Sequence, residues 1–199
     1  MSAVEKKHLT IEEYLALERK SEYKSEYYRG EMFAMTGASR KHGLIAMCVG
    51  GDIFSQLENS PCEVFQSDMR VKIEASGMYV YPDVVVACDN PQYEDDALDT
   101  LINPQVVIEI LSDSTEKYDR GAKFEHYRRL SSLKQYVLIT QDRPMVESYI
   151  RQEDDQWILW ASSDMDAVLQ LPAIGCQVPL QRIYRRVTFT EQASQNPSS

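Results

Sequence analysis

The sequence contains no long apolar run. No stretch approaches the roughly 18 apolar residues of a membrane-spanning helix, and the first residues, MSAVEKKHLTIEEY, lack the apolar segment of a secretory signal. We therefore expect a cytoplasmic protein with no membrane association. A length of 199 residues suits one domain with a real core and is short for two. The expected organisation is a single domain over residues 1–187 and a flexible tail over residues 188–199.

Cysteine, histidine and basic charge are also sparse. The four cysteines are scattered, without a CxxC pair or neighbouring histidines, so a zinc site is not expected and the thiols should be reduced and mostly buried. None of the three histidines stands in a Ser-His-Asp context, which makes a metal-free hydrolase the weakest functional alternative. Acidic residues outnumber basic ones by 31 to 21. Any nucleic-acid function must therefore depend on local basic patches and bound metal.

Apolar periodicity predicts a mixed α/β (α+β) fold, in which helices flank a mixed central sheet that carries additional antiparallel hairpins. Thr10 and Glu13 form a capping box at the first helix, and Arg29-Gly30 is the turn of an aromatic hairpin. Core candidates on two early strands are Val64, Phe65, Val71 and Ile73. The other expected elements are helices over residues 42–57 and 119–130, the second capped by Asp119, strands over residues 62–74, 81–89, 105–111 and 157–162, and a hairpin over residues 134–150.

Two acidic residues stand in the most apolar strands. Glu109 lies between Ile108 and Ile110 in QVVIEIL, and strand alternation puts it on the same face as Val107 and Leu111. A carboxylate there loses several kcal/mol of hydration unless a partner compensates, by a rough estimate. Asp83 opens the strand YPDVVVACD, from which its side chain can reach the end of a sheet.

Carboxylates delivered by neighbouring strands suit a hard cation such as Mg²⁺, which prefers oxygen ligands and keeps several waters. A nearby lysine could then orient a water or stabilise the transition state. Two simpler interpretations remain open at this stage. Glu109 could be a structural carboxylate held by an arginine, and Asp83 could only cap a strand or a turn.

The segments YPDVVVACD and NPQVVIEILSDSTEKYDRGAKFEHYRRLSSLKQYVLITQDRPMVESY resemble the Uma2-type endonuclease-like family, formerly of unknown function and common in cyanobacteria. That family is a branch of the PD-(D/E)XK nuclease superfamily, and the resemblance runs from about Leu9 to about Tyr184. It implies a restriction-endonuclease-like core. The superfamily pattern is Pro-Asp, then Asp or Glu, one residue, and Lys. Pro82-Asp83 and Glu109 match its acidic elements, whereas Leu111 occupies the lysine position.

In this family the lysine is on the following helix, and the matching residue is Lys123. The resemblance thus implies that Asp83, Glu109 and the carbonyl of Ile110 hold Mg²⁺ or Mn²⁺, and that Lys123 assists the water or the scissile phosphate. The expected activity is hydrolysis of DNA phosphodiester bonds by metal-activated water. Spacing alone favours a simpler role for Lys123, an i,i+4 ion pair with Asp119 on an exposed helix face.

Secondary candidates surround this set. Glu31 follows the hairpin turn and could add a carboxylate, and His42 could contact phosphate or hold Glu31. Weaker candidates are Asp68, Arg120, Arg128 and Arg129. The alternative function is an inactive nuclease fold that acts as a binding or assembly module, supported by the acidic composition and the absent lysine at Leu111. A homodimer through the aromatic hairpin, Tyr27, Tyr28 and Phe33, is also expected, although the same aromatics could be core.

Overall fold

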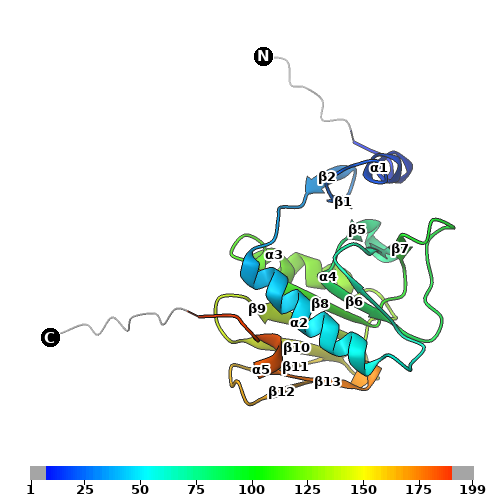
Figure 1. The fold of residues 1–199 in the computed structure, drawn as a ribbon. Helices are drawn as coiled ribbons and strands as arrows, with labels where there is room; N and C mark the ends of the chain where they lie inside the picture. Colours follow the sequence, from blue (N-terminus) through cyan, green and yellow to red (C-terminus); the bar gives the residue numbers. More distant parts are fainter. Residues whose placement is uncertain (1–7, 190–199) are drawn as a thin grey trace.

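The structure, a computed structural model, describes residues 8–189. Over this range the strands form three sheets, and helices cover both faces of the largest one (Figure 1). No helix of the described range has the length and apolar character needed to cross a membrane. The polar tail expected at residues 188–199 lies outside the described residues from position 190 onward.

The central sheet has six strands in the order β11-β10-β9-β8-β6-β3. β8 and β9 are parallel and the other neighbours are antiparallel, which confirms the expected mixed sheet. Every residue of β6 and β8 is buried, as their continuous β-branched sequences predict. The strands are β3 (Glu63–Gln66), β6 (Val84–Ala87), β8 (Val106–Leu111), β9 (Gln135–Thr140), β10 (Val146–Arg151) and β11 (Trp157–Ser162).

A second sheet, in the order β2-β1-β5-β4-β7, lies beside the first at the end that carries α1 (Ile11–Glu18) (Figure 1). The predicted capping box of Thr10 and Glu13 begins α1, and Tyr14 stacks on Tyr27 with ring centroids 4.8 Å apart. The strands are β1 (Ser25–Tyr28), β2 (Glu31–Ala34), β4 (Arg70–Ile73), β5 (Met78–Val80) and β7 (Thr100–Leu101), with the 3-10 turn η1 (Glu74–Ser76) between β4 and β5.

The hairpin turn of this second sheet is where the sequence predicts it. Tyr28 pairs with Glu31, so Arg29 and Gly30 form a two-residue turn, and both have positive φ, 48° and 84°. A mirror-image turn requires this conformation and tolerates glycine best. Of the aromatics expected at a dimer interface, Tyr27 is buried in the protein's own core, whereas Phe33 is exposed.

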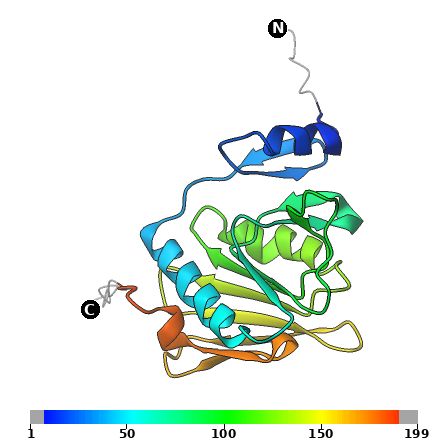
Figure 2. The same cartoon turned by 45° about the vertical axis from the view of Figure 1, so that its right-hand side comes forward.

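Helices pack on both faces of the central sheet (Figure 2). On one face lies α2 (Arg40–Gln56), which begins two residues earlier than predicted because the Ser39 hydroxyl accepts the N–H of His42. One face of α2 is buried against the sheet, whereas Met47 and Phe54 on its other face are each 63% exposed. The expectation of a largely buried helix was therefore wrong for those two positions. Near α2 lie β12 (Val168–Leu171), η3 (Pro172–Ile174), β13 (Cys176–Pro179) and α5 (Leu180–Ile183).

The opposite face of the sheet packs on a helical segment of three parts, α3 (Glu116–Tyr118), η2 (Asp119–Lys123) and α4 (Phe124–Tyr127). The middle part is a π-helix. The predicted helix therefore starts earlier than residue 119, and Asp119 lies buried within it instead of capping it. A wider turn at this point changes which side chains face the sheet, and such turns occur frequently at functional sites.

The cysteines also differ from the expectation. Cys62 and Cys88 form a disulfide across 26 residues of sequence, whereas Cys48 and Cys176 are free thiols. The pairing of β3 with β6 explains the bond. Glu63 opposes Ala87 in antiparallel register, so the residues one step outward, Cys62 and Cys88, come directly opposite each other.

Candidate functional site

The two predicted strand acids meet at one end of the central sheet. β6 and β8 are antiparallel, with Val84 opposite Ile108, so the register places Asp83 opposite Glu109. Residues directly opposite each other in an antiparallel pair have side chains on the same face. That face packs on the α3–α4 segment, because Val107 and Leu111 belong to the same core cluster as Tyr127.

Asp83 is held by a backbone and a side-chain donor. The N–H of Ile110 donates to Oδ2 at 2.7 Å, and Nε2 of His42 lies 3.2 Å from the same oxygen. Both side chains retain some solvent exposure, so this is the open side of the site. Burial disfavours the imidazolium, but the hydrogen bond and charge of Asp83 outweigh it and raise the pKa of His42. The first turn of α2 thus places beside Asp83 an imidazole whose charged form Asp83 favours.

Glu109 is the buried partner. Its Oε1 lies 2.9 Å from Nζ of Lys123 and accepts a hydrogen bond from the Tyr127 hydroxyl at 3.3 Å. Burial raises the pKa of Glu109 well above its ordinary value, and the neighbouring carboxylates of Asp119 and Asp83 raise it further, although Lys123 opposes this. Burial is thus the main reason for the raised pKa of Glu109, and a cation bound beside it would favour the charged carboxylate.

Lys123 is buried, with 5% of its surface exposed, so the simpler prediction of an exposed helix pair was wrong. The predicted ion pair with Asp119 exists at 3.5 Å, but Nζ also lies 3.1 Å from Oε1 of Glu26. Burial opposes the charge of Lys123, yet Glu109 and Glu26 outweigh it and raise its pKa. The π-helix carries both Lys123 and Asp119, and the Tyr136 hydroxyl donates to the Asp119 carbonyl at 3.0 Å.

Glu26 is the residue that sequence reasoning missed. It is buried in β1 between Ser25 and Tyr27, in a short aromatic strand, and it supplies the hairpin carboxylate on Lys123. A signal was present, since an acid inside a buried strand was the anomaly that identified Glu109. Its neighbour Tyr28 has a ring contact with His126 of α4, so the face of β1 that carries Glu26 is turned towards the helical segment.

Of the secondary candidates, His42 belongs to the site through its contact with Asp83. Glu31 is on β2 opposite Tyr28, and His42 pairs with Asp83 rather than with Glu31. Asp68 is almost fully exposed and pairs with Lys24. Arg120 is paired with both Glu116 and Glu147. Arg128 and Arg129 are exposed, and Arg129 pairs with Glu125, four residues before it.

The donor set fits a divalent cation that keeps most of its waters. Residues 8–189 contain no group of three or more histidine, cysteine, aspartate or glutamate side chains arranged to hold a metal ion. Mg²⁺ needs only one or two protein carboxylates when water and substrate complete its shell. Asp83 and Glu109 supply two, and their described contacts use one oxygen of each, Oδ2 and Oε1. The carbonyl of Ile110 as a further ligand stays a prediction.

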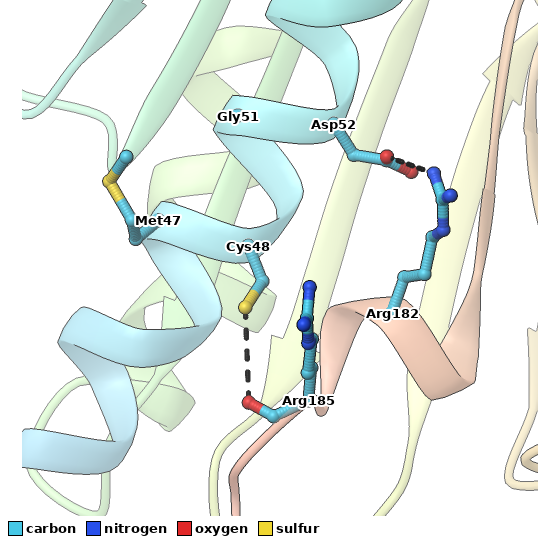
Figure 3. Close-up of a pocket in the computed structure, with 6 residues that line it drawn as sticks. All are labelled: Met47, Cys48, Gly51, Asp52, Arg182 and Arg185. Carbon is cyan, nitrogen blue, oxygen red and sulfur yellow. Dashed lines mark hydrogen bonds and ion pairs between the residues drawn. The ribbon is translucent and has the colours of Figure 1, made fainter.

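A separate hollow of about 340 Å³ opens between α2 and α5 (Figure 3). The Arg182 guanidinium pairs there with Asp52, and the Cys48 thiol lies 3.8 Å from the Arg185 carbonyl oxygen. The remaining lining residues are Met47 and Gly51. The hollow contains none of the predicted site residues.

Comparisons with known proteins identify the family and the fold. Residues 11–181 match the model of the Uma2 family, described as "Putative restriction endonuclease". Two uncharacterised proteins of Synechocystis sp. are similar: slr1290 at 33% identity, covering 91% of this chain and 94% of its own, and sll1609 at 36%, covering 77% and 86%. A crystal structure from Anabaena variabilis, titled as "a putative nuclease belonging to DUF820", superposes with a TM-score of 0.73 at 21% identity, covering 88% of this chain and 97% of its own. This last likeness confirms the predicted fold.

Proposed function

The chain belongs to the Uma2 family, and from this premise we propose that it is a metal-dependent endonuclease that hydrolyses phosphodiester bonds of DNA. The observation that carries the proposal is the position of Asp83 opposite Glu109 at the sheet end, with Lys123 2.9 Å from Glu109. Such pairs of strand carboxylates with an adjacent lysine suit phosphodiester hydrolysis, in which negative charge accumulates on the phosphate oxygens.

The residues have separable roles in this proposal. Asp83 and Glu109 would hold Mg²⁺ or Mn²⁺, which supplies a water of lowered pKa and neutralises charge on the phosphate. The Ile110 N–H and His42 keep the Asp83 carboxylate oriented, as the hydrogen bonds to its Oδ2 indicate. The Tyr127 hydroxyl, which donates to Oε1, keeps the Glu109 carboxylate oriented. Lys123 supplies a buried positive charge beside the cluster.

An acidic protein still needs a place for the DNA backbone. The first turn of α2 carries Arg40, Lys41 and His42, and the last of these contacts Asp83. Basic residues at a helix N-terminus oppose the helix dipole. Lys41 pairs with Asp142 at 3.7 Å and His42 with Asp83, while Arg40 is exposed. This end of α2 therefore supports an approach of the phosphate chain towards Asp83, despite a net charge of −10.

The second candidate is a nuclease fold that works as a binding or assembly module. Two observations favour it: Lys123 is enclosed by carboxylates, and Arg120 is neutralised by Glu116 and Glu147. This candidate predicts partner binding that does not depend on metal. It also predicts that loss of the Asp83 carboxylate leaves the protein's interactions unchanged.

The experiment compares wild type, Asp83→Asn and Asp68→Asn for Mn²⁺ binding and for cleavage of labelled single-stranded and duplex DNA. Asp68→Asn removes the same charge from an exposed position and serves as the matched control. We expect wild type and Asp68→Asn to bind metal and cleave, and Asp83→Asn to lose about a hundredfold or more in rate, as for removal of one transition-state contact. Metal binding without cleavage of either DNA would refute the nuclease, and no metal binding by wild type would favour the binding module.

A further inference from the structure

The surroundings of Lys123 contain more acid than one ammonium group can neutralise. Its Nζ lies 2.9 Å from Glu109, 3.1 Å from Glu26 and 3.5 Å from Asp119, all carboxylate oxygens. An ammonium group has three N–H donors, so the acidic partners equal the donors in number. In this arrangement the ammonium group of Lys123 faces three carboxylates of the protein, which leaves no N–H donor for a phosphate.

The three acidic partners come from different parts of the fold. Glu109 is on β8 and faces Asp83, Glu26 is on β1, and Asp119 is on the π-helix one turn before Lys123. Glu109 thus belongs to two sets at once: the pair with Asp83 and the group around Lys123. The other two carboxylates could retain the ammonium if Glu109 were engaged elsewhere. Asp119 is especially suited, because it is carried by the same helical turn as Lys123.

We infer that Lys123 and a divalent cation compete for the carboxylate of Glu109. In the metal-free protein Lys123 is the counter-ion of Glu109; when Mg²⁺ or Mn²⁺ engages Glu109, Lys123 shifts its pairing to Glu26 and Asp119. The shift frees one N–H donor for the substrate. This inference rests on the proposed metal site and assigns Glu26 and Asp119 the role of positioning residues for Lys123.

Electrostatics gives the direction of the effect. A charge of +1 lies 2.9 Å from Glu109, and it repels a divalent ion that binds the same carboxylate. Relaxation and water weaken this repulsion, but removal of the ammonium should still raise metal affinity at least about tenfold.

The test is calorimetric titration of Mn²⁺ into wild type, Lys123→Met and Lys72→Met, without DNA. Lys72 on β4 is the matched control, because it is a largely buried lysine paired with Glu74 and Glu94 in the second sheet. We expect Lys123→Met to bind Mn²⁺ at least tenfold more tightly than wild type, and Lys72→Met to stay within about twofold. Equal or weaker binding by Lys123→Met would overturn the competition while leaving the metal site intact.

A second measurement uses the wild-type protein and does not depend on the folding of a variant. The Nζ resonance of Lys123, observed by ¹⁵N NMR of labelled lysines, should shift on addition of Mg²⁺, while that of Lys72 should not. An unchanged Lys123 resonance at saturating metal would contradict the inference. If wild type binds no metal at all, the proposed function fails with it, and that outcome is distinct from equal affinity of wild type and Lys123→Met.

Discussion

Two buried cations, Lys123 and Arg70, each lie at the centre of a polar network, but the networks differ in charge balance. Arg70 is 2% exposed and Lys123 is 5% exposed. The Arg70 network joins α1 to the second sheet, whereas the Lys123 network joins the central sheet to the π-helix. Both bury a charge at a cost that partners must offset, so the identity of the partners shows what each network is for.

Arg70 is surrounded mainly by hydroxyl groups. Its guanidinium donates to Thr100 and Tyr81 at 3.0 Å each and pairs with Asp99 at 2.9 Å. Asp99 also accepts two hydrogen bonds from Arg19. The Arg19 hydrogen bonds, with help from Arg70, hold the pKa of Asp99 far below its ordinary value despite partial burial. A lowered carboxyl pKa shows that positive charge is sufficient here, as in a structural ion pair.

In the Lys123 network the pKa of the carboxyl groups is shifted in the opposite direction, upwards. Burial raises the pKa of both Glu109 and Asp119, neighbouring carboxylates add to the rise, and Lys123 opposes it only in part. Both networks look alike as collections of short contacts. The direction of the carboxyl pKa separates them: the charged form of Asp99 is favoured, whereas the buried Glu109 and Asp119 would gain from the further cation that the proposed function requires.

The largest difference should appear when Arg70 is removed. Arg70→Met removes the hydrogen bonds that the guanidinium donates to Thr100 and Tyr81, and loss of hydrogen bonds from a charged group costs about 1.5–3 kcal/mol. We expect the free energy of unfolding, measured with urea, to fall by that amount. Addition of Mn²⁺ should not restore it, whereas the stability of Lys123→Met should rise with Mn²⁺. Restoration of Arg70→Met by Mn²⁺ would erase the distinction between the two networks.

The pH dependence of stability in EDTA should separate the networks next. The folded-state pKa of Asp99 is lowered, so its contribution is present above the ordinary value of 3.8 and is lost as pH falls below it. That of Glu109 is raised, so the folded state binds the extra proton, and stability falls as pH rises above 4.5. In the curve of melting temperature against pH, Asp99→Asn should flatten the acid limb. Glu109→Gln should flatten the limb above pH 4.5. If both variants flatten the same limb, one direction is wrong.

The smallest effect is expected at an exposed pair on the helical segment that carries Lys123. Arg129 pairs with Glu125 one turn away at 3.2 Å, and both side chains are about half exposed. Such pairs contribute about 0.3–0.5 kcal/mol, so Arg129→Ala should change the urea midpoint little and leave Mn²⁺ affinity unaltered. A loss comparable to that of Arg70→Met would mean that exposure does not discriminate among these ion pairs.

Much of the fold was predictable because the sequences of its central strands fit only one kind of structure. β6 and β8 are continuous β-branched sequences that only a sheet buried on both faces accommodates. Strand alternation alone put Glu109 on the face of Val107 and Leu111, which the structure confirms. The resemblance added Lys123, whose spacing to Asp119 by itself favoured an exposed pair.

The unpredicted features depend on contacts between distant segments. Glu26 pairs with Lys123, which lies 97 positions later in the chain (123 − 26), and no local pattern encodes that approach. The π-helix depends on how Asp119 and Lys123 pack beneath the sheet, since its sequence suits an ordinary helix equally well. The disulfide required the register of β3 with β6, which sequence reasoning did not assign.

That disulfide changes the covalent topology of the chain. Joining Cys62 to Cys88 closes a ring that contains β4, β5 and Asp83, so one strand acid and part of the second sheet belong to a macrocycle. Within the ring, a single proteolytic cut leaves two fragments that separate only after reduction. Ring closure also restricts the unfolded chain, by about 3–4 kcal/mol for a ring of this size. The redox state of the surroundings therefore sets how firmly the segment that carries Asp83 is tied to the rest of the chain.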